Sequence, residues 1–243
     1  MYNNKGLVLH AKKALADKTK YMWGGIYRPI TEKYIQDLYK IYGKKQYPDS
    51  RIAELRKYIG KGYYGIDCVG LIKSYYWSGS STGGRGSKNY DKAGYPDVNA
   101  TLVFNLAKVK GTIDKIPEIP GLILYSKTHP HVGVYVGGGL VIESTLSARG
   151  DGVTKAKVSD WSGWTHWFRC PYIEYEEEKV ESGAAVKAGD RIKIKASAVY
   201  YSGGKIKIPA HCKGKAYTVQ KVSGEKVLLK EIYSWVDSKD IEV

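Results

Sequence analysis

The sequence predicts an α+β domain followed by a small all-β barrel, with an acidic linker between them. Residues 1–173 combine helical periodicity with segments that alternate apolar and polar residues. Residues 174–185 contain a run of glutamates followed by small residues, a composition typical of a linker. Residues 186–243 read as short strands separated by glycine turns, as in a small barrel. We therefore place the domains at 1–173 and 186–243.

Composition limits the classes of protein that the chain can represent. It has 243 residues, 43% of them hydrophobic, and a net charge of +15. No apolar run reaches the roughly 18 residues of a transmembrane helix, so we expect no membrane insertion. The positive surface should attract polyanions, which include nucleic acid, an anionic membrane and a bacterial wall that bears teichoic acid. Charge alone does not choose between them.

The N-terminus and the cysteines indicate where the protein is made. The first residues lack the apolar core of a signal peptide, which predicts synthesis in the cytoplasm. The cysteines, Cys68, Cys170 and Cys212, are odd in number and widely spaced, so they suit neither a disulfide framework nor a zinc site. We expect no metal and no cofactor. The sequence does not indicate the oligomeric state.

Helices and turns come first along the chain. Helical periodicity is expected over residues 6–18, 31–42, 49–59 and 97–109. Between the first two of these helices, Tyr21 and Trp23 precede two glycines, which predicts a tight turn that presents one of the aromatic rings. An aromatic corner of the core is the alternative for this pair. Residues 121–125 have the apolar composition of a buried strand.

The most informative stretch is residues 65–72. Asp67 is a good helix N-cap, and an apolar helical stripe follows it, so Cys68 should lie in the first helical turn. There the helix dipole and the unpaired backbone N–H groups favour a thiolate. A thiolate nucleophile also needs a base. The alternative is a small buried cysteine with a packing role only.

A second stretch, residues 131–143, supplies the base. It reads as a β-hairpin around three glycines. If Val136 pairs with Leu140, then His131 and Glu143 are diagonal neighbours on one face, within reach of a hydrogen bond. Cys68 as nucleophile, His131 as base and Glu143 as orienting acceptor then form a catalytic triad.

Further candidates lie after this hairpin. Residues 147–152 read as a loop in which Arg149 could bind a substrate carboxylate bidentately. An aromatic segment follows at 161–168 and suits either a sugar platform or a core. The C-terminal strands are expected at 191–196, 199–201, 216–222, 226–230 and 234–236. On them, Tyr200, Tyr201 and Trp235 are candidate wall contacts.

Three motifs together carry a family resemblance. Residues 21–25 (YMWGG), 67–71 (DCVGL) and 131–137 (HVGVYVG) resemble the successive motifs of NlpC-type cysteine peptidases, which are papain-like α+β enzymes that cut peptidoglycan stems. The C-terminal part resembles a bacterial SH3-like wall-binding domain. A catalytic domain with such a binder is similar to a phage endolysin. The resemblance implies bacterial peptidoglycan and associated wall polymers as the partners, and release from the cytoplasm before action.

The resemblance also implies roles for single residues. Cys68 would attack the amide and His131 would protonate the leaving amine. Tyr21 matches a tyrosine near the oxyanion, with Trp23 in the same motif, and Asp67 matches a residue that grips a free amino group. At the third position, 143, many members have His, Asn or Gln, whereas CHAP amidases often have an acid.

The bond that is cut therefore stays open between a stem-peptide endopeptidase and an N-acetylmuramoyl-L-alanine amidase. Residues 26–64 are longer than the family pattern and read as an insertion that could reshape the substrate groove. Three other readings remain: a non-catalytic wall binder, an acyltransferase with the same thiol chemistry, and a nucleic-acid binder. No nucleic-acid motif supports the last of these, so we expect no nucleic-acid partner.

Overall fold

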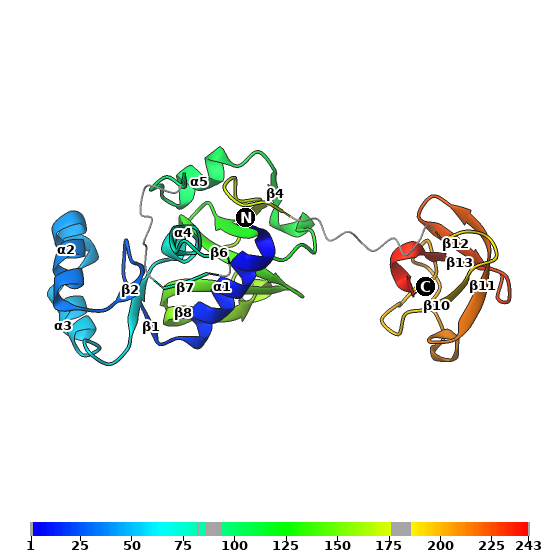
Figure 1. The fold of residues 1–243 in the computed structure, drawn as a ribbon, viewed down its shortest axis with the longest axis horizontal. Helices are drawn as coiled ribbons and strands as arrows, with labels where there is room; N and C mark the ends of the chain where they lie inside the picture. The colour runs from blue at the N-terminus through cyan, green and yellow to red at the C-terminus, as the bar shows by residue number, and fades with distance from the viewer. Residues whose placement is uncertain (1, 82, 86–93, 176–185, 243) are drawn as a thin grey trace. The chain divides into compact units, whose positions relative to one another are not determined.

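The computed structural model describes residues 2–81, 83–85, 94–175 and 186–242 (Figure 1). The chain divides into two compact units, Met1–Glu176 and Glu177–Val243. The first unit mixes helices with two sheets, and the second is built on one sheet, so the α+β class is confirmed. Most of the predicted acidic linker, residues 176–185, lies outside the described residues.

The first unit is organised around a six-stranded antiparallel sheet. Its strand order is β4-β9-β5-β6-β7-β8. The strands are β4 (Lys110–Thr112), β5 (Ile123–Ser126), β6 (His131–Gly137), β7 (Leu140–Ser147), β8 (Gly150–Lys157) and β9 (His166–Phe168). Alternation along β6 sends Val132 and Val134 into the main core and Tyr135 into a second, smaller core on the opposite face.

Two helices pack on the main face of this sheet. Figure 1 shows α1 (Asn4–Ala16) and α4 (Cys68–Trp77) across the strands, and both contribute to the main core. The Asn3 side chain caps α1 by accepting from the Gly6 N–H. Helix α5 (Ala100–Leu106), capped by Asn99, is shorter than the predicted 97–109, and the chain after it enters β4. Among the described residues, no helix is long and apolar enough to cross a membrane.

Residues 26–64 form a lateral excursion from the sheet domain. They contain β2 (Ile26–Pro29), α2 (Glu32–Gln46) and α3 (Asp49–Arg56), which lie to one side in Figure 1. β2 joins β1 (Thr19–Tyr21) and β3 (Tyr64–Ile66) in a small sheet of order β1-β3-β2. The excursion has an apolar core of its own, which includes Ile35, Leu38 and Leu55.

The central hairpin has the predicted register except near its turn. Val134 pairs with Ile142, as predicted, but Gly137 pairs with Leu140 in place of Val136. A register shift between Tyr135 and Gly137 causes the difference. It leaves Gly138 and Gly139, both with positive φ, as a two-residue turn that matches strand twist.

The prediction of a loop over residues 147–152 is also wrong, because most of these residues belong to two paired strands. β7 and β8 pair along their whole length, from Leu140 opposite Lys157 to Ser147 opposite Gly150. Residues 148–149 are therefore the tip of a second hairpin. Glycines at 150 and 152, which suggested a loop, instead adopt positive φ values inside the strand.

The second unit is a five-stranded antiparallel sheet of order β13-β12-β11-β10-β14. Its strands are β10 (Arg191–Ile194), β11 (Ala216–Ser223), β12 (Lys226–Leu229), β13 (Ser234–Asp237) and β14 (Ile241–Glu242). The predicted strand at 199–201 is reduced to a bridge between Tyr200 and Lys207. No pairing within 186–242 joins the edge strands β13 and β14, so the sheet stays open and the predicted closed barrel is wrong.

Candidate active site

The turn into α4 fixes the position of Cys68. Asp67 caps the helix as predicted: its Oδ1 accepts from the Gly70 N–H at 2.5 Å, and its Oδ2 accepts from the Gly24 N–H at 2.7 Å. Burial raises the pKa of Asp67, and these hydrogen bonds oppose that rise. A Cβ on Gly70 would lie 1.9 Å from the Gly25 carbonyl oxygen, so only glycine lets the helix start lie against the turn.

His131, at the start of β6, faces the Cys68 thiol. Burial alone would lower the pKa of His131, but hydrogen bonds with Cys68 and Glu143 outweigh it and raise the pKa to about 9. The ring Nε2 lies 2.5 Å from Glu143 Oε2. This contact leaves Nδ1 for the thiol, and the imidazole is thereby held between an acid and a nucleophile.

Glu143 lies on β7 with its side chain 1% exposed. Burial would raise the pKa of this carboxyl, but hydrogen bonds from His131 and Arg149 hold it below its ordinary value. Gly133 lies on the same face, where a Cβ would lie 3.3 Å from the Glu143 Cβ and 2.6 Å from a Val141 methyl. Because Gly133 has no side chain, nothing at this position crowds Glu143 where it contacts His131. The structure thus brings the three predicted triad residues together.

The Arg149 side chain contacts Glu143. Its Nε donates to Glu143 Oε1 at 2.9 Å, and its Nη2 donates to Glu143 Oε2 at 3.2 Å. The carboxylate that Arg149 contacts here belongs to the protein itself, and its binding of a substrate carboxylate stays a prediction. Arg149 lies at the tip of the second hairpin, at 148–149, and its side chain reaches back to Glu143 in the middle of β7.

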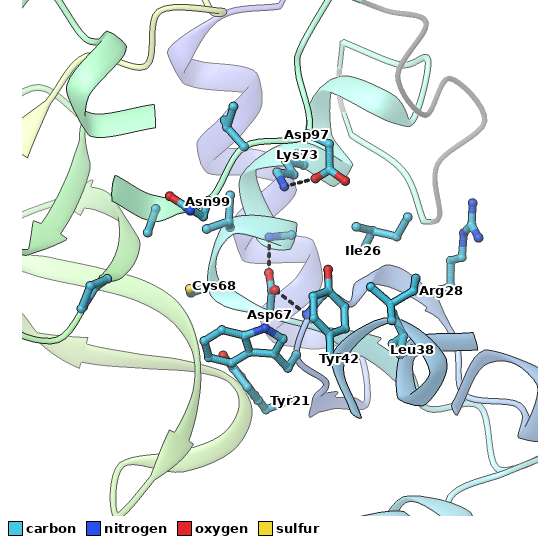
Figure 2. A pocket seen from close by; sticks show the side chains of 18 of the residues that line it. Tyr21, Ile26, Arg28, Leu38, Tyr42, Asp67, Cys68, Lys73, Asp97 and Asn99 are labelled. Carbon is cyan, nitrogen blue, oxygen red and sulfur yellow. Dashed lines mark hydrogen bonds and ion pairs between the residues drawn. The ribbon is translucent and has the colours of Figure 1, made fainter. Parts of the chain in front are cut away.

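A pocket of about 950 Å³ opens beside Cys68. Figure 2 shows Cys68 and Asp67 on one side of it, with Arg28, Leu38 and Tyr42 of the excursion opposite, and the Lys73–Asp97 ion pair above. The N-terminal end of α5 completes the lining. Residues 26–64 therefore supply a wall of the pocket, in line with the predicted reshaping of the groove.

A smaller hollow of about 270 Å³ is lined by His131. It shares Tyr21 and Trp23 with the larger pocket, so both predicted aromatic residues lie where the two hollows meet. The thiol lines one hollow and the imidazole lines the other. A chain that passes from one to the other would therefore cross both reactive groups.

Tyr21 is held by residues that the sequence did not identify as functional. Asp151 accepts from the Tyr21 N–H at 3.0 Å, and Arg51 donates to the Tyr21 carbonyl at 2.5 Å. Arg51 and Asp151 also form a bidentate ion pair with contacts of 2.9 and 2.7 Å. Burial, followed by the nearby Cys68 and Asp67, raises the pKa of Tyr21. No local pattern could have found the pair, since its members lie on α3 and β8.

The aromatic segment after β8 packs on the His131 imidazole. The ring centroids of Trp161 and Trp164 lie 5.8 and 5.6 Å from that of His131. Trp164 is buried, so the core interpretation holds for it. Trp161 lies under the Arg149 guanidinium, at 4.2 Å from its ring centroid. These rings limit the freedom of the histidine.

In the second unit, the three candidate wall contacts differ in exposure. Tyr200 is 41% exposed, whereas Tyr201 and Trp235 are half-buried. Tyr201 packs against the core of the sheet. A hydrogen bond from the Ser202 N–H to the Trp235 carbonyl ties the 200–208 segment to β13.

The described residues contain no group of three or more His, Cys, Asp or Glu side chains placed to hold a metal ion. No known family model matches the chain. No curated protein matches its sequence. The interpretation of the site therefore rests on its own geometry and on the three sequence motifs.

Proposed function

We propose that the chain is a peptidoglycan hydrolase that cleaves an amide bond of the stem peptide by a Cys-His-Glu thiol mechanism, as an endopeptidase. One observation carries the proposal: His131 lies in hydrogen-bond contact with the buried Glu143, and Cys68 acts with Glu143 to raise the pKa of His131, beside an open pocket. A packing cysteine needs neither the histidine nor the pocket. The proposed setting is that of an endolysin, made in the cytoplasm and active on the wall after release.

The geometry supports each step of the chemistry. With its pKa at about 9, His131 carries a proton at neutral pH and can pair with a Cys68 thiolate. The sulfur attacks the carbonyl carbon, and backbone N–H groups in the first turn of α4 stabilise the oxyanion by a few kcal/mol, as in comparable sites. His131 then donates its proton to the leaving amine as the C–N bond breaks. Water, deprotonated by His131, hydrolyses the thioester that remains.

The fold supports the finer family assignment. A helix that begins at the nucleophile and packs on an antiparallel sheet that carries the histidine is the arrangement that the NlpC-type, papain-like reading requires. We assign the second unit to an SH3-like wall binder, on the strength of its short antiparallel strands and the exposed Tyr200. Such a module would raise the local concentration of the enzyme on its insoluble substrate.

The acidic third residue favours a second candidate function. Glu143 occupies the position where the related amidases carry an acid, so N-acetylmuramoyl-L-alanine amidase is the alternative bond specificity. Mass spectrometry of the fragments released from purified peptidoglycan separates the two. An endopeptidase releases fragments cut between amino acids, whereas an amidase frees the whole stem from the lactyl group.

The test of the proposal is Cys68→Ala, with Cys212→Ala as the matched control in the second unit. Both cysteines are free and 7% exposed. Turbidity loss of purified walls should vanish in Cys68→Ala and persist in Cys212→Ala, while both variants still sediment with walls. Lysis by Cys68→Ala at a rate comparable to the wild type would refute the nucleophile. An inactive wild type that still sediments with walls would leave only a wall binder.

A further inference from the structure

We propose that Arg149 is a positioning residue of the thiol site, which keeps the Glu143 carboxylate aligned on His131 through a bidentate contact. The inference rests on the proposed function, since it concerns how the same thiol–imidazole pair is supported. It extends the catalytic triad by a fourth side chain, and it gives that residue a role other than substrate binding.

The contacts divide the Glu143 carboxylate between two donors. Oε1 accepts from Arg149 Nε, and Oε2 accepts from both His131 Nε2 and Arg149 Nη2. The fork of the guanidinium matches the plane of the carboxylate, so it fixes the rotation of that plane as well as its position. A carboxylate held in this way presents one oxygen to the imidazole. The second oxygen has its own donor and does not compete for the imidazole.

Burial makes this support necessary. A carboxylate with 1% of its side chain exposed has almost no water to stabilise its charge. His131 and Arg149 are the charged groups that act on it, from β6 and from the tip of the β7–β8 hairpin. His131 changes its charge during the reaction, whereas the Arg149 guanidinium stays cationic. Among the described residues, Arg149 is therefore the cation that compensates the carboxylate when His131 is neutral.

Arg149 is itself held in place on two sides. The guanidinium lies over the Trp161 ring, at 4.2 Å from the centroid, and the Arg149 backbone N–H donates to Ser147 Oγ at 3.1 Å. Trp161 packs edge-on against Trp164, with ring centroids 4.8 Å apart. A rigid aromatic base under a partly desolvated guanidinium is the expected environment for an arginine that positions another group.

The experiment compares Arg149→Gln and Arg149→Lys with wild type over a pH series. Alkylation of Cys68 by iodoacetamide, read at peptide level by mass spectrometry, reports the site without any substrate. In Arg149→Gln the acid limb of the alkylation profile should move up by about one pH unit, because Glu143 protonates more readily. Alkylation of Cys68 near pH 6 should therefore be roughly tenfold slower than in wild type. Arg149→Lys keeps the charge and should recover most of this loss.

Kinetics on purified peptidoglycan supply the second readout. Arg149→Gln should lower kcat about tenfold to a hundredfold and leave KM unchanged, because the Nε and Nη2 donors of the guanidinium are engaged with Glu143. The matched control is Arg85→Gln. Arg85 also binds a carboxylate, that of Asp17, through both Nε and Nη2, and lies 4.8 Å from the Tyr64 ring centroid. Its loss should lower stability and leave the acid limb unchanged.

Two results would overturn the proposal. One is an alkylation profile for Arg149→Gln that coincides with wild type in a folded variant, with folding checked by thermal unfolding. The other is a raised KM with kcat retained, which would return Arg149 to substrate binding. If wild type releases nothing from the wall, the proposed function fails, but the alkylation profiles still decide the role of Arg149.

Discussion

Substitution of Glu143 by Gln tests the electrostatic basis of the site most directly. The amide keeps nearly the same shape but removes the charge that His131 and Arg149 share. Its NH₂ group cannot accept from the guanidinium, so one of the two Arg149 contacts is lost. The imidazolium then stands in a buried site without the carboxylate that pairs with it.

The magnitude follows from the pKa of His131. Its pKa stands at about 9 against an ordinary 6.5. This difference corresponds to at most about 3 kcal/mol of stabilisation of the imidazolium, to which Cys68 and Glu143 both contribute. Because the folded-state value is raised, this stabilisation is fully present below pH 6.5 and is lost as pH rises through 9. In Glu143→Gln the pKa of His131 should fall toward 6.5 or below, since burial opposes the charge.

Two assays measure this change. The basic limb of the kcat/KM profile on purified peptidoglycan should move from near pH 9 toward neutrality, and kcat at neutral pH should fall about tenfold to a hundredfold. The Tm of wild type should decline between pH 6.5 and 9, and this decline should shrink in Glu143→Gln. An unchanged basic limb, with folding intact, would refute the assignment of Glu143 as the group that holds the imidazolium.

Three other perturbations follow from the structure. Gly70→Ala should cost more than about 2 kcal/mol of stability, seen as a lower denaturant midpoint, because its Cβ would overlap a backbone carbonyl at 1.9 Å. Arg51→Gln should lower kcat/KM about tenfold by releasing the Tyr21 carbonyl, with a smaller effect on the Tm; equal effects on both would indicate a purely structural role. Burial lowers the pKa of His10 to about 3, so stability should fall as pH drops from 6.5 toward 3. His10→Gln should flatten this acid dependence of the Tm, and a dependence that persists would place its origin elsewhere.

The contacts around Asp67, His131 and Glu143 could be predicted from the sequence because each depends on local geometry. Asp67 caps the helix that begins at Cys68, and period-two alternation places His131 and Glu143 on one face of a hairpin. The bulge before Gly137 did not disturb this prediction, because it shifts the register only beyond Tyr135 and leaves the end that carries the site unchanged. The hairpin turn itself was wrong for the same reason.

The supporting residues could not be predicted in this way. The polar, glycine-containing stretch 147–152 that includes Arg149 predicts a loop, and a hairpin tip has the same composition. Arg51 reaches Asp151 from α3, and no periodicity links segments so far apart in the sequence. The Arg51–Asp151 ion pair depends on how the excursion packs against β8. That packing is set by the tertiary structure, and no local sequence pattern reports it.

The division of labour between the sheet and the excursion has a consequence for specificity. Cys68, His131 and Glu143 come from α4, β6 and β7, which all contribute side chains to the main core, where close packing opposes small shifts. The pocket wall opposite Cys68 comes from β2 and α2, which belong to an excursion with its own core. Exposed side chains on that wall, such as Ile41, can therefore change without loss of the thiol–imidazole contact. Under the proposed function, specificity for the bond and the chemistry of its cleavage would be encoded in separate segments, joined at Tyr21 by the Arg51–Asp151 pair.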